Sequence, residues 1–276
     1  MKQLLLSATL FLSIAANAQQ IKLNKGQKIT ITSSLVQDID MGIGQINNST
    51  NTTSVLNIKD ADNKNYNAVY TLSKLSISVD AMGQQDSYDS EKPEDKDKEL
   101  GKSLGEKIGK EVNVTIDKTT GNTVAETPPT PEKEEEQDNP FAGMKEMFGA
   151  ADSEAGITQS AFFIIPAGKK AGDSWTDSVA VSDAMKGSKT YTIKSINGTE
   201  AVITVFSKME GKQNIELQGM QIDIALSAKT EGELLVDTKT SLLKKSSRVA
   251  DVTGNMDMMG QSMPITSKLT ETTEYK

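Results

Sequence analysis

The sequence has 276 residues, a formal net charge of −8 and a hydrophobic content of 36%. It contains no histidine and no cysteine, which excludes disulfide bonds, zinc sites built from those ligands and catalysis through a histidine base. The acidic balance argues against nucleic acid and anionic lipid surfaces as partners, because both select basic patches. We therefore expect no cofactor and no metal, and a core filled mainly by aliphatic side chains and methionine.

The first eighteen residues are typical of a secretory signal peptide. Lys2 gives a positive start, residues 4–15 are mostly apolar, and a small-x-small site ends at Ala18. The segment is too short for a membrane span, and cleavage between Ala18 and Gln19 leaves no second apolar segment in the mature chain. No cysteine follows that site, so a thioether-linked lipid anchor is not expected. The predicted location is the periplasm or the outside of the cell.

Residues 19–126 form the first predicted β-rich half. From Lys28 to Met41 apolar and polar side chains alternate, as in a strand with one buried face. The apolar face of this strand carries Ile29, Ile31, Leu35 and Ile39. Further strands are predicted over residues 47–59, 66–79, 84–90 and 112–116. The alternation slips near Lys74, which indicates a β-bulge.

The character of the sequence changes in two places. A helix is predicted near residues 94–109, because apolar residues recur there at every fourth position after a proline. The Pro- and Glu-rich segment 127–139 cannot bury a core and is predicted to be a linker. Residues 140–276 then begin with a segment expected to be partly helical. Its apolar side chains include Phe141, Met144 and Phe148.

The rest of residues 140–276 forms a second β-rich half. Asn197-Gly198 is a strong hairpin signal between strands predicted over 189–196 and 200–209. A strand is predicted over 214–229, where Ile222, Ile224 and Leu226 alternate with polar residues. The last predicted strands cover residues 232–237, 242–253 and 262–275.

The predicted fold class is mainly β with minor α. Long antiparallel strands would form a curved sheet or half-barrel built of two similar halves, with two helical segments. A faint repeat supports the two halves, because Met-Gly turns followed by glutamine recur at residues 41–45, 82–84 and 259–261. The sequence leaves open whether the halves share one core.

No catalytic site emerges from the residue pattern. The pair Asp60 and Asp62 imitates the start of a calcium loop but lacks the glycine and the closing glutamate, so a hairpin turn is the better interpretation. Asp38 and Asp40 share the polar face of one strand, which is most simply a solvated face. Ser246 lies near lysines, but consecutive strand residues point to opposite faces. We therefore predict that the protein is not an enzyme.

Several short segments resemble a family of uncharacterised secreted proteins of Bacteroidota, known only as a domain of unknown function. The segments that carry the resemblance are Tyr88-Asp89-Ser90, residues 112–117, Ile165-Pro166 and Gly172-Asp173-Ser174-Trp175. Many members of the family are lipoproteins, from which this chain departs by having no cysteine. The pattern is also similar to the half-barrels that carry lipids or lipoproteins across a periplasm.

Two functions are compatible with these features. The first is a non-catalytic periplasmic binding or carrier protein for a lipid, another apolar ligand or an acylated partner. Its predicted ligand face comprises Ile29, Ile31, Leu35, Ile39, Phe141, Met144, Phe148, Ile222, Ile224 and Leu226. The alternative is an interaction or structural protein of the cell envelope without a small-molecule ligand, which would use strand edges or the acidic segment 127–139.

Overall fold

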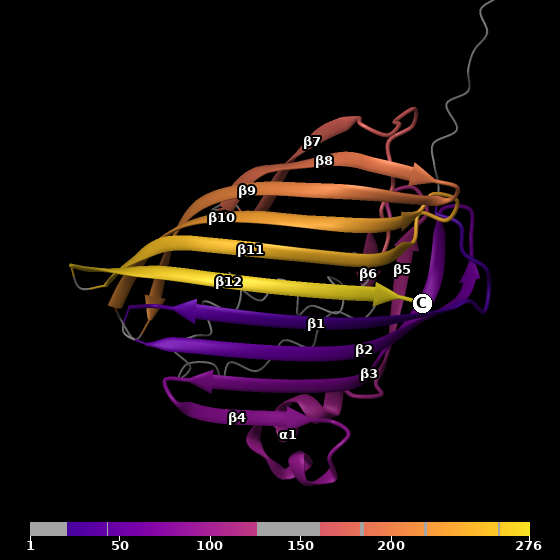
Figure 1. The fold of residues 1–276 in the computed structure, drawn as a ribbon. Helices are drawn as coiled ribbons and strands as arrows, with labels where there is room; N and C mark the ends of the chain where they lie inside the picture. Colours follow the sequence, from indigo (N-terminus) through magenta and orange to yellow (C-terminus); the bar gives the residue numbers. More distant parts are fainter. Residues whose placement is uncertain (1–20, 43, 126–160, 183–184, 218–219, 259) are drawn as a thin grey trace, which may run out of the picture.

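The computed structural model describes residues 21–42, 44–125, 161–182, 185–217, 220–258 and 260–276. Within them, twelve strands form one antiparallel sheet in the order β6-β5-β3-β2-β1-β12-β11-β10-β9-β8-β7, with β4 paired to the end of β3 (Figure 1). The strands of the first half are β1 (Lys28–Asp40), β2 (Gln45–Ala61), β3 (Asn65–Ala81), β4 (Gln84–Asp89), β5 (Glu111–Asp117) and β6 (Thr123–Ala125). Those of the second half are β7 (Ser174–Ser182), β8 (Met185–Asn197), β9 (Glu200–Leu217), β10 (Met220–Asp237), β11 (Leu243–Met258) and β12 (Gln261–Tyr275). The predicted mainly β class is confirmed.

Strand β1 joins the two halves into one sheet. It pairs with β2 on one side and with the last strand, β12, on the other. At the end of that ladder, the backbone of Lys276 exchanges two hydrogen bonds with Thr30, at 2.7 and 2.9 Å. The two β-rich halves are therefore continuous through their hydrogen bonds.

The sheet curls strongly. The backbone N–H groups of Ile21 and Lys22 donate to the carbonyls of Lys118, at 2.9 Å, and Thr240, at 3.2 Å. These carbonyls lie in the turns after β5 and before β11, which are separated in the sheet by β3, β2, β1 and β12. In a flat sheet, five interstrand spacings would place the turns about 24 Å apart. Two consecutive residues bridge them instead, and Figure 1 shows β5 and β6 lying behind the broad front of the sheet.

Most buried apolar residues lie on the inner face of the curved sheet, in two clusters. The main cluster draws on both halves and includes Ile21, Ile29, Ile31, Leu56, Ile58, Tyr70, Val114, Ile116, Phe162, Ile193, Ile203, Val236 and Tyr275. The second cluster consists of Ile222, Ile224, Leu226, Met256 and Ile265, with Met185, Val252 and Met263 packed against it. Leu226 and Val236 are ten residues apart on β10, about 34 Å along a strand. The clusters therefore occupy opposite ends of the sheet, and the two halves share the main one.

Equivalent turns in the two halves show the internal repeat more clearly than the Met-Gly turns do. The Asp117 carboxylate accepts the N–H groups of residues 119 and 120, and the Asp237 carboxylate accepts those of residues 239 and 240. Four residues after each aspartate the backbone turns left-handed, with φ of 76° at Gly121 and 61° at Ser241. Both of these residues donate their N–H back to the aspartate carbonyl.

Helical structure in the described residues is short. Where one helix was predicted near 94–109, the structure has three short pieces: a 3₁₀ turn (Pro93–Asp97), helix α1 (Glu99–Leu104) and a second 3₁₀ turn (Gly105–Lys107). Gly101 explains the tight packing, because a Cβ there would meet the carbonyl oxygen of Asp95 at 2.0 Å. The predicted linker 127–139, and the second helical segment up to residue 160, fall outside the described residues.

Two predicted strands have the wrong bounds. Residues 232–237, predicted as a strand of their own, are the end of β10. The stretch 214–229 is not a single strand but the end of β9, at Leu217, and the start of β10, at Met220, which pair as a hairpin. A change in the phase of the alternation marks the hairpin. Buried side chains fall at odd positions on β9, such as Ile203, and at even positions on β10, such as Ile224. A two-residue turn produces this change of phase, and the apolar character of the later residues concealed it.

Candidate functional site

The inner face of the sheet is continuous across the strands. Ile77, Leu35, Val205, Tyr191 and Trp175 fall in one row, connected through the pairings of β3, β2, β1, β12, β11, β10, β9, β8 and β7. Alternation therefore places them on the same side of the sheet. This row lies between the two clusters, and it is where the inner face changes from packed core to accessible surface.

The structure divides the predicted ligand face into three groups. Ile29 and Ile31, each 1% exposed, belong to the main cluster. Ile222, Ile224 and Leu226 belong to the second cluster. Only Leu35 and Ile39 are half-buried and in neither cluster. Phe141, Met144 and Phe148, and the predicted cleavage residues Ala18 and Gln19, fall outside the described residues.

A band of apolar side chains remains half-buried between the clusters. It comprises Leu35, Ile77, Val205 and Leu269, and we call it the middle band. Polar pairs interrupt it: the Gln37 side chain donates to the hydroxyl of Ser267 at 3.4 Å, and both residues are buried. Thr273 likewise donates to the hydroxyl of Ser33 at 3.1 Å. The middle of the inner face therefore carries apolar side chains separated by polar groups, and the positions between Leu35 and Val205 in their row are Glu271, Arg248 and Gly232. Ligand-binding surfaces combine apolar side chains with a few fixed polar groups.

Three aromatic rings line the β7 side of this band. Trp175, the only tryptophan, stacks on Tyr191 at a centroid distance of 5.2 Å, and Phe163 lies 5.1 Å from Tyr191. We call these three residues the aromatic patch. All three are half-buried. Burial, and the negative charge of Asp177, raise the pKa of the Tyr191 hydroxyl to about 12, so this hydroxyl stays neutral over the physiological range.

Charged side chains also reach the inner face. Arg248 on β11 forms an ion pair with Glu271 on β12. Lys189 lies on β8, directly opposite Asp177 on β7 and the buried Ser207 on β9. Burial lowers the pKa of the Lys189 ammonium, the positive charge of Arg248 lowers it further, and Asp177 acts in the opposite direction. A half-buried cation thus lies beside the aromatic patch.

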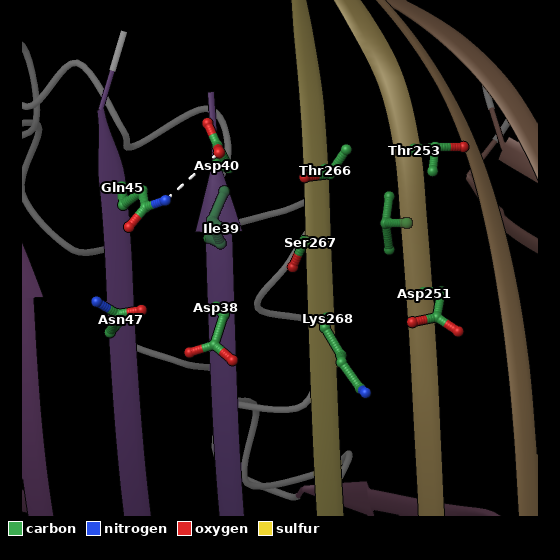
Figure 2. Close-up of a pocket in the computed structure, with 11 residues that line it drawn as sticks. Asp38, Ile39, Asp40, Gln45, Asn47, Asp251, Thr253, Thr266, Ser267 and Lys268 are labelled. Atoms are coloured by element: carbon green, nitrogen blue, oxygen red, sulfur yellow. Dashed lines mark hydrogen bonds between the residues drawn. The ribbon is translucent and has the colours of Figure 1, made fainter. Parts of the chain in front are cut away.

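The outer face carries a separate, shallow hollow of about 550 Å³ over β2, β1, β12 and β11 (Figure 2). In the register, Lys268 lies between Asp38 and Asp251. Asp40 accepts the N–H of Gly42 at 2.8 Å and the side-chain amide of Gln45 at 3.5 Å. In the described part of the chain, no three acidic groups lie close enough to hold a metal ion. This hollow is a solvated polar strand face, as the sequence indicated for Asp38 and Asp40.

Sequence reasoning missed the aromatic patch and Lys189. The signal was present, because Lys189, Tyr191 and Ile193 alternate on one predicted strand and Trp175 belongs to a segment that carries the family resemblance. The pairing of β7 with β8, which brings Trp175 opposite Tyr191, could not be derived from periodicity. The Asp60 segment, by contrast, behaves as expected: Asp62 accepts the N–H groups of Lys64 and Asn65 in a turn.

A comparison with known protein families identifies the family of this chain. A family model described as "Family of unknown function (DUF6263)" matches residues 63–243. The chain belongs to this family. The DUF6263 match begins just before β3 and ends at the start of β11, so it spans both halves of the sheet. The resemblance to a family of unknown function is confirmed, while its secretion and its link to Bacteroidota stay predictions.

Other comparisons concern curated sequences and solved structures. No curated protein sequence matches the chain. A structure titled "Lipid-protein interactions in lipovitellin" is similar with a TM-score of 0.49 and 9% identity, over 92% of this chain and 25% of that one. OccK5 (OpdH) of Pseudomonas aeruginosa has a TM-score of 0.25 and 6% identity, over 90% and 98% of the two chains. The chain therefore spans about a quarter of the lipovitellin chain.

Proposed function

We propose that this protein is a non-catalytic binding or carrier protein for an apolar ligand or an acylated partner, and that it acts in the periplasm or outside the cell. The observation that supports it is the middle band on the inner face. Leu35, Ile77, Val205 and Leu269 keep part of their apolar surface accessible on the curled side of the sheet. Apolar surface on a concave face, beside a few fixed polar groups, is what a ligand with an acyl chain requires.

The second cluster supports the proposal through its composition. Met256 is buried there, and Met185 and Met263 pack against the cluster while staying partly accessible. Methionine is flexible and polarisable, and adapts its shape to different apolar partners. A binding face that ends in methionines can accept chains of different length without a rearrangement of the sheet.

We also propose that the protein has no catalytic activity. The chain has no histidine or cysteine, so a nucleophile would need a lysine or carboxylate as its base. Lys189 lies on the inner face, where burial lowers the pKa of its ammonium. Ser207 on β9 lies directly opposite Lys189, and no hydrogen bond between the two side chains is present in the described residues. In the described part of the chain no helix is long and apolar enough to cross a membrane.

The alternative, a protein-binding role in the envelope, is favoured by one observation. Strand β7 is the last in the sheet order, and among the described residues only β8 pairs with it. Its other edge can accept a strand from a partner. This function would not depend on the middle band.

Binding of a neutral apolar probe to the full chain tests the proposal. Energy transfer from Trp175 to N-phenyl-1-naphthylamine reports a probe near the aromatic patch. Leu35→Gln on the inner face is expected to weaken binding about tenfold. The adjacent outer-face variant Val36→Gln, at a residue 45% exposed, is the matched control and should bind as the wild type does. Equal binding by both variants, or no binding by the wild type, contradicts the proposal and favours the edge-strand alternative.

A further inference from the structure

We infer that the ligand of the inner face carries an anionic head group, and that the ammonium of Lys189 is its counter-ion beside the aromatic patch. This inference rests on the proposed function and adds to it the chemical class of the ligand: an acyl chain that ends in a carboxylate or a phosphate.

Lys189 lies between the aromatic patch and the second cluster. It lies on β8 one row from Tyr191, with Gly187 on its other side, and all three residues belong to the inner face. Trp175 and Tyr191 flank it toward the main cluster, and Met209 and Met185 follow toward the second cluster. A chain bound along the middle band would therefore end within reach of the ammonium, with aromatic rings on one side and methionines on the other.

The Lys189 ammonium has no ion-pair partner among the described residues. Three other lysines of the second half pair with carboxylates: Lys194 on β8 with Glu233 at 3.2 Å, Lys208 on β9 with Glu210 at 2.7 Å, and Lys244 on β11 with Glu200 at 2.6 Å. No carboxylate of the described residues lies within 4 Å of the Lys189 ammonium, and Lys189 is half-buried, whereas Lys194 and Lys208 are exposed. Burial of an unpaired charge is costly and usually has a functional reason.

Charged groups of β7, β11 and β12 face the part of the inner surface around Lys189. Four charged groups face this part of the inner surface: Asp177 on β7, Lys189, and the pair of Arg248 and Glu271. Glu271 is occupied by Arg248, and Asp177 is exposed. The effects of burial and Arg248 exceed that of Asp177, so the pKa of Lys189 is lowered. Asp177 is thus the remaining negative charge that faces Lys189, and it lies beyond ion-pair distance of the ammonium, so an anionic head group would supply a closer one.

The net charge of the whole chain acts against the binding of an anion. The chain carries a net charge of −8, so its long-range field disfavours anions. A preference for an anionic ligand must then come from a local cation. A neutral acyl chain would gain nothing from Lys189, and a cationic one would be repelled by it.

Competition among dodecyl compounds tests the inference with the full chain. Dodecanoate, dodecyl phosphate, dodecanol and dodecylamine, each below its micelle concentration, compete with bound N-phenyl-1-naphthylamine. One or both anions should displace the probe at concentrations about tenfold lower than dodecanol, the order expected for a charge-assisted contact. Comparison of the two anions distinguishes a carboxylate from a phosphate head group.

Variants assign the effect to Lys189. Lys189→Met should remove the preference for anions while dodecanol competes as before, and Lys189→Arg should keep the preference. Lys208→Met, which removes a paired lysine on β9, is the matched control. An equal affinity for dodecanol and both anions, or a preference that survives Lys189→Met, overturns the inference and leaves the proposed function standing. Failure of the probe and of every dodecyl compound to bind overturns both.

Discussion

Truncation of Leu56 tests whether the two halves of the sheet depend on one core. Leu56 lies on β2 in the first half, is 0% exposed and belongs to the main cluster, which also contains Ile203 and Val236 of the second half. Leu56→Ala should lower the free energy of unfolding by about 3 kcal/mol, because a buried leucine loses its transfer energy and leaves a cavity. With a urea slope of about 3 kcal/mol per molar, the midpoint should fall by about 1 M.

Trp175 makes the readout specific, because the only tryptophan lies on β7 in the second half. Its emission and the far-UV circular dichroism should change together, and both midpoints should shift in Leu56→Ala. The outer-face control Val36→Ala should change stability by less than about 1 kcal/mol. A tryptophan transition that keeps its wild-type midpoint in Leu56→Ala would refute the shared core and show that the halves unfold independently.

Three further predictions concern turns and titration. Ser241→Gly should stabilise the fold by about 0.5–1 kcal/mol, measured by urea unfolding, because it removes a left-handed non-glycine residue at the position that Gly121 holds in the other half; a loss of stability would contradict the equivalence. Backbone N–H donors lower the pKa of Asp117, so its contribution to stability is present above the unfolded pKa near 4 and is lost as pH falls below it. Asp117→Asn should therefore flatten the decline of Tm between about pH 4 and 2, and an unchanged slope would count against it. The raised pKa of Tyr191, about 12, gives the reverse sign: its contribution is present below the unfolded pKa near 10 and is lost as pH rises toward 12. Tyr191→Phe should reduce that alkaline loss, and an identical alkaline decline would show that Tyr191 is not its source.

Local features of the fold could be predicted from the sequence because they depend on local chemistry. The alternation in β1 gave its buried face, and the Asn197-Gly198 turn gave the β8–β9 hairpin, where Gly198 adopts a φ of 61°. The slip near Lys74 corresponds to the register shift between β2 and β3. Each of these is set by residues within a few positions of one another.

Long-range features could not be predicted in this way. Alternation does not specify which strand pairs with which, so the joining of β1 to β12 and the bridge from Ile21 and Lys22 to distant turns were out of reach. The same limit applies to the site. Periodicity placed Ile31 and Leu35 on one face, but only the curl of the sheet buries Ile31 in the main cluster and leaves Leu35 half-buried.

The central claim is that the inner face holds an apolar ligand, and native mass spectrometry of the full protein from its own cells tests it most directly. The intact complex is weighed, and the same preparation is extracted with organic solvent. We predict one acyl-chain compound per protein chain, with an anionic head group, which Leu35→Gln retains less well than Val36→Gln. A bare protein mass together with an empty extract would contradict the claim.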